Sequence, residues 1–228
     1  LLAGDSRVED AAFQMNAVEI VLDQDNGSLE AVGTVRTLWT DSENPVLVLS
    51  GRAAGDETRI IFTESTELWS GSTHVSASTI DVDPTLRNFV ALDQVVSIID
   101  DLRFWSDRME FDEQGGVLHH SGSVRALSDA VELNAADLRV RLIDGEADEV
   151  VATGDVRVQG PEFDGRGDAA VYDRSSATVT LTGPEAEVSD SVSGAVSGCR
   201  LVLDVETRDA TVESGDDCRV VSRRSVNN

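Results

Sequence analysis

Histidines are the residues of this chain best suited to metal binding or proton transfer, and the sequence holds 3 of them. His119 and His120 are adjacent, and His74 stands alone. Neighbouring residues of a β-strand face opposite sides, so His119 and His120 cannot easily share one metal ion. The sequence contains no Gly-x-Ser-x-Gly motif, and neither cysteine lies beside a histidine. We therefore expect a protein that is not an enzyme and that has no metal site.

Two other patterns resemble ligand-binding motifs, and each lacks an essential part. Residues 165–170 fit the dinucleotide signature G-x-G-x-x-G/A, but the residues that follow alternate as a strand where a helix is required. Asp23 begins a calcium-like loop whose glycine is one place early and whose twelfth residue is Thr34 where a glutamate is required. The acidic pairs at 81/83 and 216/217 are typical of solvated surface. The sequence thus predicts no cofactor.

The chain has 2 cysteines, Cys199 and Cys218, which flank the last predicted hairpin. Counting outward from its turn places them nearly opposite each other, which favours a disulfide over two buried thiols. Such a bond would close a loop of about 20 residues and contribute about 3 kcal/mol in the chain-entropy model. It would also indicate an oxidising compartment such as a bacterial periplasm.

Charge excludes one class of partner. The formal net charge is −25, and all 18 cationic side chains are arginine. Binding to phosphates needs a basic face, so nucleic acid is not an expected partner. The acidic residues either solvate the surface or attract a cationic ligand.

A phrase of about thirty residues recurs along the chain, which is the signature of stacked structural repeats. Each copy runs from an alternating apolar strand through a polar turn into a second strand that ends in Gly-x-Val or a near relative. The closing glycines are Gly33, Gly122, Gly154, Gly183 and Gly215. Asp93 sits where another glycine is expected, and a less regular unit occupies residues 44–73.

Valine-rich alternation without a long helical pattern predicts an all-β fold. We expect an elongated β-jellyroll or V-shaped β-solenoid of about seven stacked strand–turn–strand units. One continuous apolar stripe results, and the sheet must fold over to cover it. If the two halves close fully, the stripe is only a core. If they splay, it lines a groove. The inward residues of this stripe are Met109, Phe111, Val124, Leu138, Val140, Leu142, Val156, Val171, Val179, Leu181, Leu201, Leu203 and Val212.

The repeated phrase, Ala-x-x-apolar-x-apolar-Asp followed by apolar-x-x-Gly-x-Val, resembles the OstA-like β-jellyroll family. Its members are the lipopolysaccharide-transport proteins LptA, LptC and the N-terminal domain of LptD. The residues that carry the resemblance are Ala152–Val156, Gly167–Asp173, Leu181–Gly183 and Gly198–Asp204. It covers residues 104–220, and residues 14–100 more loosely.

The resemblance implies a non-enzymatic periplasmic protein that shields acyl chains between the inner and outer membranes. The inward residues of the stripe, from Met109 to Val212, would then be the lipid-binding residues. Its partners would be lipopolysaccharide or another acyl lipid, and other β-jellyroll envelope transport proteins that pair through edge strands. A segment before Leu1 would provide any membrane association.

The sequence leaves the domain division and the function each with an alternative. Residues 1–100 would form a less regular LptC-like or N-terminal β-jellyroll part and residues 101–228 an LptA-like part, or the two would be one continuous domain. The alternative function is a structural β-solenoid, or an accessory subunit of a cell-envelope assembly, with a sealed core.

Overall fold

The computed structural model describes residues 2–23, 25, 27–40, 44–85, 88–128, 131–161, 163–190, 194–204, 207, 210–213 and 220–223. Within these residues the chain forms sixteen β-strands and no helix. The strands are β1 (Leu2–Glu9), β2 (Phe13–Asp23), β3 (Ser28–Trp39), β4 (Val46–Gly55), β5 (Ile60–Ser70), β6 (Thr73–Asp83), β7 (Asn88–Ile99), β8 (Leu102–Asp112), β9 (Val117–Leu127), β10 (Glu132–Ile143), β11 (Glu146–Gln159), β12 (Phe163–Asp173), β13 (Thr178–Asp190), β14 (Gly194–Asp204), β15 (Ala210–Glu213) and β16 (Val221–Arg223). The all-β prediction is confirmed.

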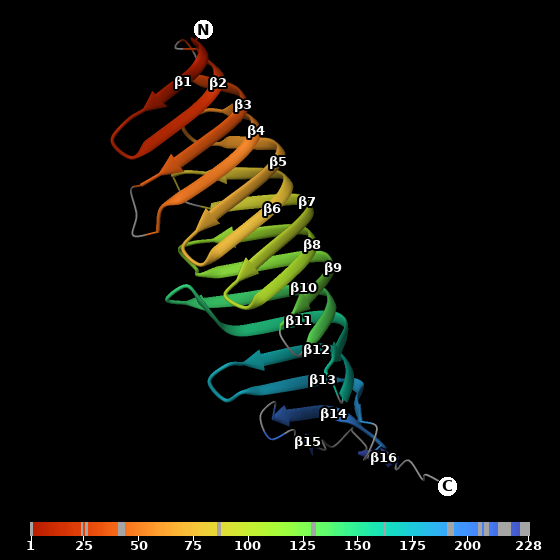
Figure 1. The fold of residues 1–228 in the computed structure, drawn as a ribbon. Helices are drawn as coiled ribbons and strands as arrows, with labels where there is room; N and C mark the ends of the chain where they lie inside the picture. Colours follow the sequence, from red (N-terminus) through yellow and green to blue (C-terminus); the bar gives the residue numbers. More distant parts are fainter. Residues whose placement is uncertain are drawn as a thin grey trace.

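All the described strands belong to one antiparallel sheet in which each strand pairs with the strands before and after it in the chain. The order runs from β1 to β15 without a crossover, and β16 pairs with β14 beside β15. Figure 1 shows the result as an elongated stack with the two termini at opposite ends. The sheet continues through residue 100, because β7 pairs with β8.

Short polar turns join the strands, and aspartates at the strand ends fix several of them. Between β1 and β2, the carboxylate of Asp10 accepts hydrogen bonds from the backbone N–H groups of Ala12 and Phe13, at 2.8 and 2.9 Å. Asp56 does the same after β4, and its hydrogen bonds with Thr58 lower the pKa of its carboxyl. These are Asx turns, in which the side chain replaces a backbone acceptor and fixes the direction of the hairpin.

Each long strand bends near its midpoint, where the pairing register shifts by a residue or more. In the odd-numbered strands β3 to β11 the bend consists of two residues with positive φ. These pairs, called the bend residues here, are Gly33/Thr34, Glu64/Ser65, Asp93/Gln94, Gly122/Ser123 and Gly154/Asp155. The predicted closing glycines therefore lie in the middle of their strands, which corrects the expectation that they end them. Gly183 occupies the equivalent bend of β13, and Gly215 lies outside the described residues.

Neighbouring strands approach so closely at the bends that two facing side chains do not fit. A Cβ atom added to Gly154 would lie 2.7 Å from the Cβ of Ala136, and one added to Gly33 would lie 2.9 Å from a methyl carbon of Val18. At the bend of β5 the arrangement is reversed. Glu64 carries a side chain there, and the glycine is Gly51 on the adjacent strand β4, where an added Cβ would lie 2.7 Å from that of Glu64.

The variant Gly154→Ala should therefore lower the free energy of unfolding by about 2 kcal/mol, because it adds a steric conflict to an unfavourable φ of 84°. Gly27→Ala is the matched control, since Gly27 has a φ of 72° and no atom within 4 Å of an added Cβ. Its cost should be the smaller conformational one alone. Urea unfolding of both variants measures the difference, and equal losses would contradict the close approach at the bend.

Candidate functional site

The bends divide the sheet into two arms that face each other across a shared interior (Figure 1). The first arm consists of the C-terminal halves of the even-numbered strands and the N-terminal halves of the odd-numbered strands. The second arm consists of the remaining halves. Side chains alternate between the interior and the outer face along each half-strand, as the burial of β6 illustrates with Val75, Ala77, Ile80 and Val82 inside.

Most of the predicted lipid-binding residues point into this interior. Met109, Leu138 and Val140 are 0% exposed. The others that are buried are Val124, Val156, Val179, Leu181, Leu201 and Leu203. Phe111, Leu142 and Val212 are partly buried and pack against the same core. Their role in lipid binding stays a prediction.

Val171 is the exception, because it lies on the outer face. Its neighbour Ala170 is 2% exposed and faces the interior, opposite Leu181 and Ala152 on the adjacent strands. Alternation then places Val171 outside, beside Thr180. The inward position that carries Leu138 in β10 is occupied by the small Ala170 in β12. The prediction that Val171 faces inward is wrong because it chose the more apolar valine over its neighbour Ala170.

The two arms are closed on each other. Inner side chains at many points along the stack, such as Val48, Phe62 and Leu118, have no exposed surface. Leu181 of the first arm reaches the second arm at Gly165, where an added Cβ would lie 2.7 Å from the leucine Cδ1. In this structure the apolar stripe is therefore a packed core.

The interior changes in character along the stack, which sequence reasoning missed. Four buried aromatic residues, Trp39, Phe62, Phe89 and Phe104, all precede β9. Trp39 of the second arm meets Phe62 of the first edge-on, with ring centroids 6.1 Å apart. From β10 to β14 the buried hydrophobic residues of the described chain are alanine, valine and leucine.

His120 forms a polar connection between the arms inside this core. It lies in the first-arm half of β9 and is 0% exposed. Its Nε2 is 3.2 Å from the hydroxyl of Ser97 in the second arm, and its Nδ1 is 3.0 Å from the hydroxyl of Ser106 at the bend of β8. The ring also stacks on Phe104 of the second arm at 5.0 Å. Burial away from water lowers the pKa of His120 to about 3, so the imidazole is neutral at physiological pH.

The adjacent histidine points the other way, as strand alternation predicts. His119 Nε2 lies 2.9 Å from a carboxylate oxygen of Asp137 on the outer face. Among the described residues, no cluster of histidine, cysteine and carboxylate side chains has the arrangement of a metal site. Alternation with the buried Leu118 is the signal that could have placed His120 in the core.

Buried hydroxyl groups line the interior near the bends of the same part of the chain. Ser50 and Ser106 donate to the carbonyl oxygens of Arg52 and Arg108, two residues further along their own strands. The hydroxyls of Ser6, Thr37 and Thr66 are buried without a hydrogen-bond partner. Every buried polar side chain of the described chain lies between residues 6 and 120.

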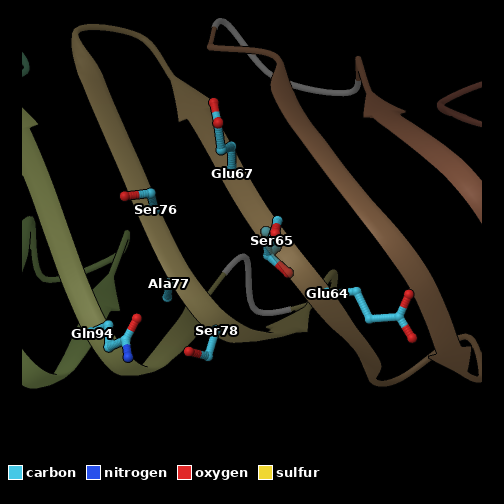
Figure 2. A pocket seen from close by; sticks show the side chains of 8 residues that line it. Glu64, Ser65, Glu67, Ser76, Ala77, Ser78 and Gln94 are labelled. Atoms are coloured by element: carbon cyan, nitrogen blue, oxygen red, sulfur yellow. The ribbon is translucent and has the colours of Figure 1, made fainter.

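A concave feature lies at the bends of β5, β6 and β7 (Figure 2). It is an open depression of about 460 Å³. Most of its lining is polar and includes Glu64, Glu67, Ser76 and Gln94. Carboxylates and hydroxyls do not suit an acyl chain, so the interior remains the candidate site for an apolar ligand.

The rejected motifs have the structures that the sequence predicts for them. Residues 165–170 lie within strand β12, so no helix follows the glycines. Asp23 ends β2, and the backbone N–H of Gly27 donates to its carbonyl oxygen at 2.8 Å, which makes a turn. Asp216 and Asp217 lie outside the described residues.

Several arginines of the described chain form ion pairs with acidic side chains at the surface. Arg141 lies 2.6 Å from Asp148, and Arg125 lies 2.8 Å from Glu132. Arg125 also stacks over the ring of Trp105 at 4.9 Å.

Cys199 is disulfide-bonded, and its predicted partner Cys218 lies outside the described residues. No helix in the described chain has the length and apolarity needed to span a membrane.

The single bent sheet with an enclosed apolar face defines the fold as an elongated β-jellyroll. Residues 105–209 match the model of the family described as LptA/(LptD N-terminal domain) LPS transport protein. The resemblance to the OstA-like lipopolysaccharide-transport family is thus confirmed over these residues. That family consists of transport proteins and not of enzymes, which agrees with the prediction for this chain.

Comparison with solved structures finds LptH from Pseudomonas aeruginosa, the LptA-homologous periplasmic component of the lipopolysaccharide transport device. The two chains share 16% identity with a TM-score of 0.48, and the alignment covers 55% of this chain and 99% of LptH. A comparison with curated proteins gave no match.

Proposed function

We propose that this protein carries lipopolysaccharide, or another acyl lipid, across the periplasm and shields its acyl chains between the two arms. The observation that supports the proposal is the continuous aliphatic interior of a chain whose residues 105–209 match a family of lipopolysaccharide-transport proteins. A disulfide at Cys199 is compatible with an oxidising compartment such as the periplasm. No chemical step is involved, because the ligand is only sheltered from water.

Binding in the interior requires the arms to separate. Separation of aliphatic side chains exposes apolar surface, at about 25 cal/mol per Å². An acyl chain that enters the gap covers the same surface again and buries its own methylene groups, each worth about 0.8 kcal/mol. The closed arms therefore represent the empty state, and the bound lipid supplies the free energy that keeps them apart.

Edge strands at both ends of the sheet suit end-to-end pairing with related proteins. In the described chain β1 pairs only with β2, which leaves its other edge free along Leu2–Glu9. At the opposite end β14 pairs with β15 along one half and with the three-residue β16 along the other. Such an edge presents backbone N–H and C=O groups to an added strand. We also propose that residues 1–100 act as an LptC-like or N-terminal β-jellyroll part within the same sheet.

Photo-crosslinking tests the proposal with neighbouring residues on opposite faces. A crosslinker at Val140, which is 0% exposed in the interior, should capture lipopolysaccharide in the cell. The control is Arg139, which is exposed on the outer face and should capture none. Capture from Arg139 alone would contradict a lipid-binding interior.

The full burial of the inner face favours one alternative, a structural or accessory β-solenoid with a permanently sealed core. Mass spectrometry of lipids that co-purify with the protein distinguishes the two functions. A transport protein should retain acyl lipid, and a sealed solenoid should retain none.

A further inference from the structure

We infer that acyl chains occupy only the interior of β10–β14, and that the arms of β1–β9 stay closed when lipid is bound. The inference rests on the proposed function and adds to it the part of the interior that the lipid uses. Three differences between the two parts carry it, and the polar connection at His120 lies at their boundary.

The first difference is the set of contacts that hold the arms together. Ser97 and His120 belong to opposite arms and are joined by a hydrogen bond of 3.2 Å inside the core. Separation of the arms here would leave Nε2 of the imidazole and the Ser97 hydroxyl without partners, while Nδ1 would keep its contact with Ser106 at the bend of β8. An acyl chain in the gap has no group that can replace them, so lipid cannot compensate for the loss.

The second difference is the space between the arms. Rings from both arms meet in the N-terminal part, as Trp39 meets Phe62 and as Phe104 stacks on His120. Such contacts fill the gap with large rigid groups that have few alternative rotamers. Between β10 and β14 the buried hydrophobic residues are alanine, valine and leucine, and Ala152, Ala170 and Ala186 are among them. The rings of Phe163 and Tyr172 pack against this part of the core from near the ends of β12 and are only partly buried.

The third difference is the packing at the margins of the arms. Eight of the fourteen partly buried hydrophobic residues that pack against the core lie between residues 131 and 212. Leu133, Leu142 and Val196 are among them and lie near the ends of their half-strands. The aliphatic part is therefore the part where the interior is easiest to reach, and opening it breaks no buried hydrogen bond that the structure describes.

A matched pair of crosslinker positions tests the inference on the full-length protein. Val46 and Leu133 both lie near the start of an even-numbered strand, in the second arm, and both are partly buried against the core. With lipopolysaccharide as the probe, a crosslinker at Leu133 should capture lipid, and one at Val46 should give only the signal of protein without crosslinker. Circular dichroism should show that both substituted proteins are folded.

The outcomes separate the inference from the proposed function. Capture at both positions would overturn the inference and leave the proposed function standing. Capture at Val46 alone would also overturn it, and capture at neither position, nor at Val140, would overturn both.

Hydrogen exchange of the unmodified protein provides a measurement without substitutions. Addition of lipopolysaccharide should change amide exchange in β10–β13 and leave β3–β6 unchanged. A change of similar size in β3–β6 would contradict the inference.

Discussion

Leu138→Ala should lower the free energy of unfolding by about 3 kcal/mol, because it leaves a cavity in the core that is packed between the two arms. Leu138 is 0% exposed and lies between His120 and Ala152 on the neighbouring strands. Chemical denaturation of the purified, lipid-free protein measures the loss. The matched control is Arg139→Ala, which removes an exposed side chain and should change stability by less than about 0.5 kcal/mol.

The size of this effect also reports whether the arms are closed in solution. A leucine that lines an open trough would lose few contacts on truncation, so a loss of less than about 1 kcal/mol would contradict the closed core. Addition of lipopolysaccharide should reduce the difference between Leu138→Ala and the unsubstituted protein, since flexible acyl chains can fill the cavity.

The second large effect concerns pH. The folded pKa of His120 is about 3, and the unfolded chain has the ordinary histidine value of about 6.5. As the pH falls below that value, the unfolded chain binds a proton that the folded protein does not, so stability is lost. This single group should remove about 2 kcal/mol between pH 7 and pH 5, and more as the pH falls further toward 3.

Carboxylates also titrate in acid, so the measurement must compare variants. Glu132 is held by Arg125, and the hydrogen bond between them lowers the pKa of that carboxyl, which adds a loss of stability at lower pH. The variant His120→Leu should reduce the fall in unfolding free energy between pH 7 and pH 5, and His74→Gln should keep it because the buried imidazole remains. If the free energy of unfolding fell equally with pH in the unsubstituted protein and in His120→Leu, the loss could not be due to His120.

The fold was accessible to sequence reasoning because its signals are local. Alternation in segments such as Leu138 to Leu142 predicts strands, and the spacing of Gly33, Gly122, Gly154 and Gly183 predicts the repeat. The bend at Glu64 escaped detection since its glycine, Gly51, lies on the adjacent strand. At each bend one of the two facing residues must lack a side chain. A sequence motif defined within one strand does not detect the bend when the glycine lies on the neighbouring strand.

The interior was less accessible because it depends on contacts between residues far apart in the sequence. Alternation shows which residues share a face but not which face is inner. Choosing the more apolar set gives the inner face correctly for Leu138 and Val140 and wrongly for Val171, because Ala170 takes the inner place in that strand. Whether the arms close depends on how side chains from opposite arms fill the space between them. The bond between Ser97 and His120 joins strands that do not pair, and no periodicity in the sequence encodes it.

The uncrossed order of the strands has a consequence for how such a protein can change its reach. From β1 to β13 each strand pairs only with its neighbours in the chain, so duplication or loss of one thirty-residue segment within this range leaves the pairing of the others intact. Two added strands would lengthen the body by about 10 Å. Evolution can thus adjust the length of the body in discrete increments.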